Sequence, residues 1–212
     1  MSIAGVILPT NFRQMSAVEA GIVNTVFGPT LPFQFRIYIA DGIGLHNVPF
    51  TVPTSVLSSA LLAAGIANPI LPGVAPRIGL GLAAGYAASV ANAGFVINVG
   101  PKYYPDLTIT AWRKDLLVHE MTHVWQGKHS VFALSATLGA LAAQCRGMSV
   151  SGGFSGRSGA YAYSVTSPLA PWGNFNPEQQ AQIVEDWYHD GSSSSADVFP
   201  YIRDYVRKGR TS

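Results

Sequence analysis

The sequence predicts an α+β fold, in which a small sheet packs on a long buried helix and a second helix follows later in the chain. Polar and apolar residues alternate over residues 33–39, and an apolar run fills residues 95–99; both patterns are typical of strands. Residues 106–126 contain neither Gly nor Pro, which favours a long helix. The 212 residues suit one domain. We expect a strand and Ala-rich part over about 1–105 and the helices of the site over about 106–212.

A short helix and a turn are expected near the N-terminus. Ser16 is followed three residues later by Glu19, and this capping-box spacing predicts a helix over residues 16–27. Asp41-Gly42 is a turn signal, so we expect residues 45–52 to return as a strand.

The region 55–93 is strongly apolar. Residues 55–67 are typical of an apolar helix, and the Ala/Gly-rich residues 80–93 suit close helix packing. The first run ends at Asn68 after about 13 residues, whereas a membrane span needs about 20. We therefore expect this region to pack in the core or on a partner, and membrane insertion is the less favoured alternative.

The candidate chemistry lies in the pattern His-Glu-x-x-His. His119 and His123 are four residues apart, so on a helix they share one face and both imidazoles can reach one Zn²⁺ ion. Glu120 lies at the edge of that face, where it can take a proton from a water that the metal polarises. The pattern predicts a metal site with Glu120 as the general base.

The surroundings of this motif favour a buried helix. Thr108 or Thr110 can cap its start, and Gly127 can end it. The face away from the histidines carries an apolar stripe at positions i, i+4 and i+7: Leu117, Met121 and Val124. Two histidines and a glutamate that face inward are costly to bury without partners, and a metal ion supplies one.

The remaining chain predicts further helices. Residues 130–145 are apolar, and the Gly/Ser-rich residues 147–159 indicate a loop. Asn176 as cap and Pro177 in the first turn predict a helix that runs to about His189. Ser-rich residues 192–195 indicate a flexible linker, and residues 198–208 a final helix with a basic end.

The residues alone leave three candidates for a third zinc ligand, the usual number in a catalytic site. His129 lies six residues after His123, but the class with that spacing has Gly where this chain has Gln126. Glu178 lies in the first turn of the later helix. Glu185 is seven residues further on and shares a helix face with Glu178.

Three runs of the sequence resemble a known family. They are Leu-Val-His-Glu-Met-Thr-His-Val-Trp-Gln (117–126), Ala-Tyr-Ala-Tyr (160–163) and Phe-Asn-Pro-Glu-Gln-Gln-Ala-Gln-Ile-Val-Glu-Asp-Trp-Tyr (175–188). They resemble the zincin-like metallopeptidase domains of Rhs-type and type VI secretion proteins, particularly the C-terminal peptidase domain of some type VI spike proteins. The resemblance covers roughly residues 107–206.

This resemblance implies a zincin-like fold of the gluzincin type and a zinc metallopeptidase activity. It implies that His119, His123 and Glu178 hold the zinc and that Glu120 is the general base. It therefore favours Glu178 over His129 and Glu185 as the third ligand.

Other polar residues are candidates for supporting roles. Tyr161 or Tyr163 can donate a hydrogen bond to the oxyanion of a peptidase reaction, although each also suits a buried core. Asp115, Asp186 or Tyr188 can orient a ligand from behind.

The resemblance also implies an antibacterial effector toxin that acts on a peptide or protein. We expect a secretion-apparatus carrier, an immunity protein and delivery into a target bacterial cell, with the periplasm favoured over the cytoplasm. The first nine residues lack a charged region before their short apolar run, so we expect a route independent of a signal peptide. A net charge of +2 does not favour nucleic acid as a partner. Cys145 is the only cysteine, so the fold does not depend on an internal disulfide.

Two alternatives belong to other functional classes. The chain can be a non-catalytic binding module stabilised by zinc, and a fourth protein ligand on the metal would favour that function. It can also be a membrane-active toxin that inserts the apolar region 55–93, and liposome leakage that chelators leave unchanged would favour that one.

Overall fold

The computed structural model describes residues 2–3, 6–7, 9–31, 36–42, 48–53, 93–129 and 161–211. The predicted helices over 55–67 and 130–145 and the predicted loop over 147–159 lie outside the described residues, as does all but the last residue of the 80–93 stretch. Within the described part of the chain, no helix is both long and apolar enough to cross a membrane.

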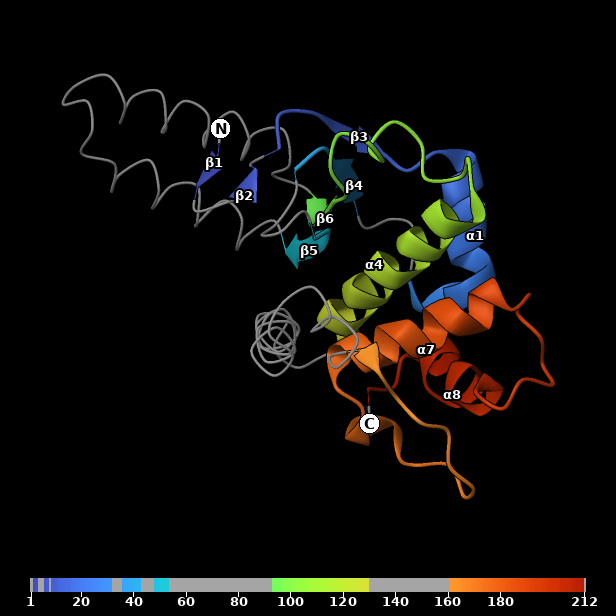
Figure 1. Cartoon of the computed structure of the whole chain (residues 1–212). Coiled ribbons are helices and arrows are strands. Elements are labelled where there is room, and N and C mark those ends of the chain that lie inside the picture. Colours follow the sequence, from blue (N-terminus) through green and yellow to red (C-terminus); the bar gives the residue numbers. More distant parts are fainter. Residues whose placement is uncertain are drawn as a thin grey trace, which may run out of the picture.

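The fold is α+β with a small mixed sheet, as predicted at this coarse level (Figure 1). Its strand order is β3-β4-β6-β5, where β4 and β6 are parallel and the two outer pairs are antiparallel. The strands of this sheet are β3 (Phe12–Gln14), β4 (Arg36–Ala40), β5 (Phe50–Pro53) and β6 (Ala93–Asn98). Two more short strands, β1 (Ser2–Ile3) and β2 (Val6–Ile7), pair with each other.

The prediction that residues 45–52 return beside the strand at 33–39 is wrong in its pairing. The second strand, β5, lies next to β6 and not next to β4. The physical reason is long-range pairing: β6 inserts between the two strands and bonds to both. β6 is therefore internal, and the sheet edge that contacts the motif helix is β5.

The predicted N-terminal helix is confirmed as α1 (Ala17–Phe27), which continues into the 3-10 turn η1 (Gly28–Thr30). The Ser16 hydroxyl accepts from the Glu19 N–H, and the Glu19 carboxylate accepts from the Ser16 N–H. The same carboxylate accepts two bonds from Arg13 at 2.6 Å and one from the Leu107 N–H at 3.2 Å. Glu19 thus joins the start of α1 to the segment that leads into the motif helix.

The motif helix is α4 (Ala111–His129), and it lies between the sheet and the C-terminal helices (Figure 1). The Thr110 hydroxyl accepts from the Arg113 N–H, so Thr110 and not Thr108 caps the start. The prediction that Gly127 ends the helix is wrong. A Cβ at Gly127 would lie 2.6 Å from the Phe95 ring, so this glycine allows α4 to pack closely on β6.

The C-terminal segment packs on the other side of α4. It contains the 3-10 turn η3 (Trp172–Asn174), α7 (Pro177–His189), α8 (Phe199–Asp204) and the 3-10 turn η4 (Val206–Lys208). Asn176 caps α7 as predicted, with Gln179 completing a capping box. The single helix predicted over 198–208 is interrupted at Tyr205. Residues 192–195 form a turn whose Ser193 carbonyl accepts from the Trp187 indole at 2.9 Å.

The core joins the sheet, α1, α4 and α7 in one cluster. The predicted stripe Leu117, Met121 and Val124 is buried in it. Trp125 is also buried, and its indole N–H donates to the Val206 carbonyl at 3.0 Å. The sheet and the C-terminal helices therefore fix α4 from both sides, with its polar residues held between rigid elements.

Candidate metal centre

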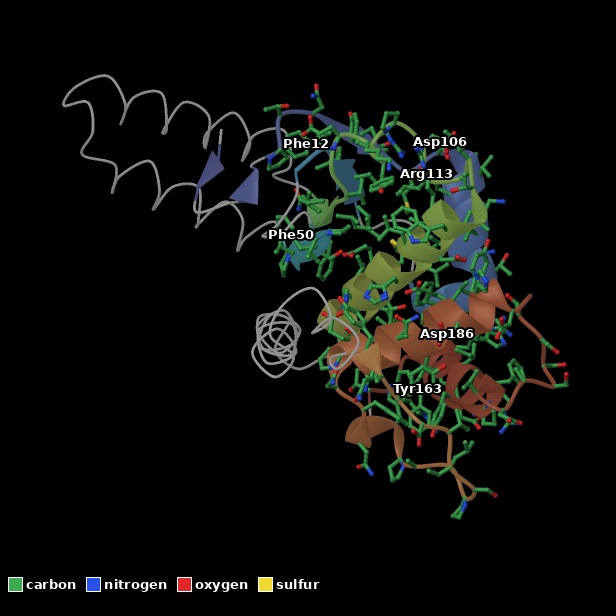
Figure 2. The ribbon with its side chains drawn as sticks, viewed as in Figure 1. Phe12, Phe50, Asp106, Arg113, Tyr163 and Asp186 are labelled. Carbon is green, nitrogen blue, oxygen red and sulfur yellow. The ribbon has the colours of Figure 1, made fainter. Side chains whose placement is uncertain are left out.

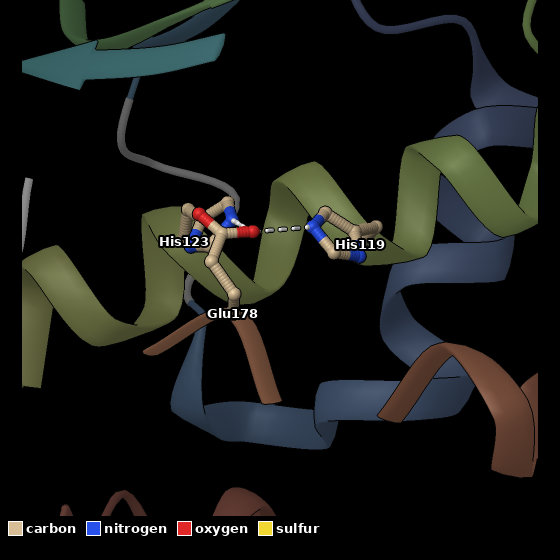
Figure 3. A group of neighbouring side chains, drawn as sticks. All are labelled: His119, His123 and Glu178. Atoms are coloured by element: carbon tan, nitrogen blue, oxygen red, sulfur yellow. Dashed lines mark hydrogen bonds and ion pairs between the residues drawn. The ribbon is translucent and has the colours of Figure 1, made fainter. Parts of the chain in front are cut away.

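Three side chains from α4 and α7 meet in one group. His119 and His123 lie one turn apart on α4, and both point towards Glu178, which α7 brings from 55 or more residues later (Figure 3). The Glu178 Oε2 atom is 3.3 Å from His119 Nε2 and 3.5 Å from His123 Nε2. One ligand atom from each residue lies within 4.8 Å of the other two. This group could hold a metal ion.

Local sequence explains how Glu178 reaches this place. Asn176 and Gln179 cap α7, and Pro177 opens its first turn, so the helix begins at a defined residue. Ala181 and Val184 then face the core with Trp187. Glu178, one turn before Ala181, is consequently directed into the buried space above α4 with no exposed surface.

The carboxylate and the two imidazoles of the group shift one another's pKa values. Burial alone would raise the pKa of Glu178, but His123 and His119 outweigh it and hold that pKa well below its ordinary range. Burial likewise acts to lower the pKa of His119, but Glu178 and Glu185 raise it to about 10. The pKa of His123 is also raised, because Glu178 outweighs burial. The Glu178 carboxylate thus stabilises positive charge on the two imidazoles that face it.

The donor types of the group suit several divalent metal ions, zinc among them. Two imidazole nitrogens and one carboxylate oxygen are a common ligand set for catalytic zinc. Ligand atoms that lie about 2.0–2.1 Å from a tetrahedral ion are roughly 3.4 Å from each other. The two distances to Glu178 Oε2, 3.3 and 3.5 Å, are close to this value, whereas the group as a whole spans up to 4.8 Å, so its ligand atoms would have to move closer together around an ion. Among the described residues, the group contains these three members.

The other two candidates for the third ligand have different positions. Glu185 approaches the far side of the His119 ring, where its Oε2 atom lies 2.8 Å from Nδ1. It therefore orients His119 from behind and is not part of the group. His129 lies at the end of α4, where its Nε2 atom is 3.0 Å from the Thr30 carbonyl and its ring packs on Trp125 and Gly209. Its role there is structural.

Glu120 is buried beside the two histidines and is held by the sheet. Its Oε2 atom accepts from the Thr51 hydroxyl of β5 at 2.7 Å, and both residues are buried. Burial raises the pKa of Glu120, while His123, His119 and the Thr51 hydroxyl act in the opposite direction. The edge strand thus fixes one carboxylate oxygen of the motif glutamate.

A cavity of about 350 Å³ opens at the site. His119 and Glu120 both line it, so a histidine of the candidate metal group and the predicted base face the same space. Tyr161 lines it as well, with its ring centroid 5.6 Å from that of His119. The apolar part of the wall consists of Val48, Pro49, Trp112 and Leu116.

The remaining predicted residues lie further away. Tyr163 lies close to Asp186 (Figure 2), and its hydroxyl donates to that carboxylate at 2.7 Å. Burial and this nearby negative charge both raise the pKa of Tyr163. Asp115 accepts from the exposed His189 at 2.8 Å and so orients that residue. Tyr188 packs against the core. In the described part of the chain, the side-chain hydrogen bonds of His119 and His123 go to Glu178, Glu185 and Gln126, and not to these four predicted residues.

Two residues at the site were not predicted from the sequence. Gln126 lies three residues after His123, and its Oε1 atom is 2.8 Å from His123 Nδ1. This i, i+3 spacing was a usable signal, because such residues are neighbours on a helix. Thr51 had no such signal, because it reaches Glu120 only through the packing of β5 on α4.

The chain matches no known family model, and neither the curated proteins nor the solved structures compared with it contain a similar chain.

Proposed function

We propose that the chain is a zinc-dependent metallopeptidase with a zincin-like arrangement of the gluzincin type. One observation carries this proposal: Glu120 and the ligand histidine His119 line the same cavity next to a buried His-His-Glu group. A general base must lie within reach of the reacting water, and a metal must have a position open to it. The cavity wall that His119 and Glu120 share supports both requirements.

His119, His123 and Glu178 would hold the ion. Zinc in such a site supplies a Lewis acid, which polarises the carbonyl of the substrate and brings the pKa of water towards 7. Glu185 keeps the His119 ring in place from behind.

Glu120 acts as the general base. It accepts one proton from the attacking water as the oxygen bonds to the peptide carbonyl carbon, and it delivers that proton to the amine nitrogen when the C–N bond breaks. The Thr51 hydroxyl donates to the Oε2 atom of Glu120, so the Oε1 atom is the one available to accept the proton of the water. Thr51 thereby sets the direction in which the base works.

Tyr161 is the better candidate for the oxyanion donor. It lines the same cavity as His119 and Glu120, and its ring centroid lies 5.6 Å from that of His119, whereas Tyr163 does not line this cavity. A hydroxyl near the reacting carbonyl stabilises the negative charge that develops on its oxygen. An extended peptide chain is the substrate that suits this site, because β5, the edge strand among the described strands of the sheet, lies next to Glu120 and can pair with a peptide backbone.

We further propose the biological setting that the resemblance implies. The chain would be an antibacterial effector that a secretion apparatus carries into a target cell, where an immunity protein of the producing cell can block it. The cavity then is the surface that such an inhibitor has to cover.

The test combines metal content with peptide hydrolysis. The purified wild-type chain should hold about one zinc ion and cleave members of a peptide library, and a chelator should stop the cleavage. Glu120→Gln should keep the zinc and lose hydrolysis by about 10²–10⁴-fold, because a general base contributes that much. Hydrolysis by Glu120→Gln at the wild-type rate would refute the proposed mechanism. Hydrolysis that survives complete removal of the metal would also refute it.

A further inference from the structure

We propose that Gln126 and Gln180 form an amide relay that positions His123 and the first turn of α7 together. The relay starts at the ring nitrogen of His123 that faces away from Glu178. Gln126 Oε1 lies 2.8 Å from this Nδ1 atom, and Gln126 Nε2 lies 3.0 Å from Gln180 Oε1. Gln126 and Gln180 are 5% and 8% exposed, so solvent has little access to replace these bonds.

Backbone carbonyls decide which way each amide points. Gln180 Nε2 donates to the carbonyls of Trp172 and Phe175, at 3.2 and 3.3 Å. A carbonyl oxygen can only accept, so the amino group of Gln180 must face these two groups. Its Oε1 atom therefore faces Gln126 as an acceptor.

The same reasoning fixes Gln126. Its Nε2 atom faces two acceptors, Gln180 Oε1 and the Pro177 carbonyl, which is 2.9 Å away. Its Oε1 atom is consequently the atom that faces His123. Since this oxygen can only accept, the Nδ1 atom of His123 must carry a hydrogen and donate it. The Nε2 atom of His123 then remains as the ligand atom on the side of Glu178.

One side chain thus acts on two ligands at once. Gln126 orients the His123 ring and also binds Pro177 and Gln180, the residues on either side of Glu178 in the first turn of α7. Gln126 and Gln180 are positioning residues, because neither touches the ion or a substrate. Their effect on metal affinity rests on the proposed zinc site, whereas the hydrogen on His123 Nδ1 does not.

The relay is tested first in the metal-free chain by NMR of the histidine side chains. The Nδ1–H hydrogen of His123 should be visible and slow to exchange with solvent in the wild type. It should exchange at least about 10-fold faster in Gln126→Leu, which removes the acceptor. The matched control is Gln182→Leu on α7, the helix that carries Gln180, because the Gln182 amide donates to Asp186 and lies outside the relay. It should leave the exchange unchanged.

The second measurement is zinc affinity, by competition with a chelator. Gln126→Leu should weaken binding by about 10–100-fold, the usual effect of losing a group that orients a ligand histidine. Gln180→Met should weaken it less, because Gln126 then keeps the Pro177 carbonyl. The circular dichroism spectrum of each variant shows whether it is folded, and Gln180→Met provides the milder change if Gln126→Leu does not fold.

The outcomes separate the two proposals. Fast exchange of His123 Nδ1–H in the wild type, or equal exchange in wild type and Gln126→Leu, would overturn the relay even if zinc binds. Unchanged zinc affinity in both relay variants would also overturn it. If the wild type shows the protected hydrogen but binds no metal, the relay stands and the proposed metallopeptidase function fails.

Discussion

Glu178 and Glu120 are two buried carboxylates of one site with opposite surroundings. They are 0% and 3% exposed. Two imidazole nitrogens lie within 3.5 Å of Glu178, and they lower its pKa although burial acts to raise it. Glu120 accepts from the neutral hydroxyl of Thr51, and burial raises its pKa. Similar burial therefore accompanies a lowered pKa for Glu178 and a raised pKa for Glu120, because only Glu178 bonds directly to the imidazole nitrogens.

Among the variants that test this comparison, Glu178→Ala should have the largest effect on zinc binding. It removes one of three ligand atoms, so zinc affinity should fall by more than the roughly 100-fold that losing a supporting group can cost. Hydrolysis should disappear with it. Inductively coupled plasma mass spectrometry of the purified chain measures the bound zinc.

The matched control is His129→Ala, which removes a histidine at the end of α4, the helix of His119 and His123, where His129 bonds to the Thr30 carbonyl. This variant should keep the zinc, although it should unfold more easily. If His129→Ala loses zinc and Glu178→Ala retains it, the assignment of the third ligand is wrong.

A third buried glutamate, Glu19, extends the comparison to a carboxylate outside the candidate metal group. Its partners are Arg13 and the N–H groups of Ser16 and Leu107. Burial acts to raise its pKa, but Arg13 and the N–H groups of Ser16 and Leu107 hold it below its ordinary value. Such a lowered pKa stabilises the fold above the unfolded pKa, and the contribution is lost as pH falls through the folded pKa. Glu19→Gln should thus lower the free energy of unfolding by about 2 kcal/mol at neutral pH.

Urea unfolding at several pH values measures this effect. The difference in free energy of unfolding between wild type and Glu19→Gln should be largest at pH 7. It should shrink below about pH 4, because the wild-type carboxyl group then also takes up a proton. Zinc content should be equal in both. A difference that stays constant down to pH 2 would show that the charge of Glu19 does not carry the stabilisation.

Thr51→Val removes only the hydroxyl that holds Glu120. Loss of a hydrogen bond to a charged group costs about 1.5 kcal/mol or more, so kcat should fall roughly 10-fold while zinc content stays the same. Thr51→Ser keeps the hydroxyl and should restore most of the rate. Equal rates for the Val and Ser variants would mean that the bond from β5 to Glu120 has no role in positioning the base.

Glu185→Gln should have the smallest effect. The amide can still accept from His119 Nδ1, but it lacks the negative charge that makes the ring a stronger ligand. We expect zinc affinity to fall by about 10-fold or less, as measured by competition with a chelator. A complete loss of zinc would instead place Glu185 among the ligands.

Local sequence patterns predicted several helices correctly. The capping boxes at Ser16 and Asn176 mark the starts of α1 and α7, because a cap involves only atoms within one turn of helix. The spacing of His119 and His123 likewise places both rings on one face of α4, since helix geometry alone determines it. The zinc itself, the zincin-like fold and the toxin function stay predictions.

Errors occurred where a residue has a long-range partner. Gly127 resembles a helix end in the sequence, but it lies inside α4 because the Phe95 ring occupies the place of a side chain. The strand near 45–52 was expected beside 33–39, yet β6 pairs between them. Neither partner is close in sequence, so no local pattern could reveal it.

The sequence by itself determined which helices form at the site and which face of α4 carries the histidines. Only the tertiary structure decided which of Glu178, Glu185 and His129 meets them, because the distance from each candidate to the histidine rings depends on how α7 and the end of α4 pack. It also placed Thr51 against Glu120 and Gln126 against α7. The physical reason is that hydrogen bonds within a turn of helix depend on neighbouring residues, whereas contacts between elements depend on how the whole core packs.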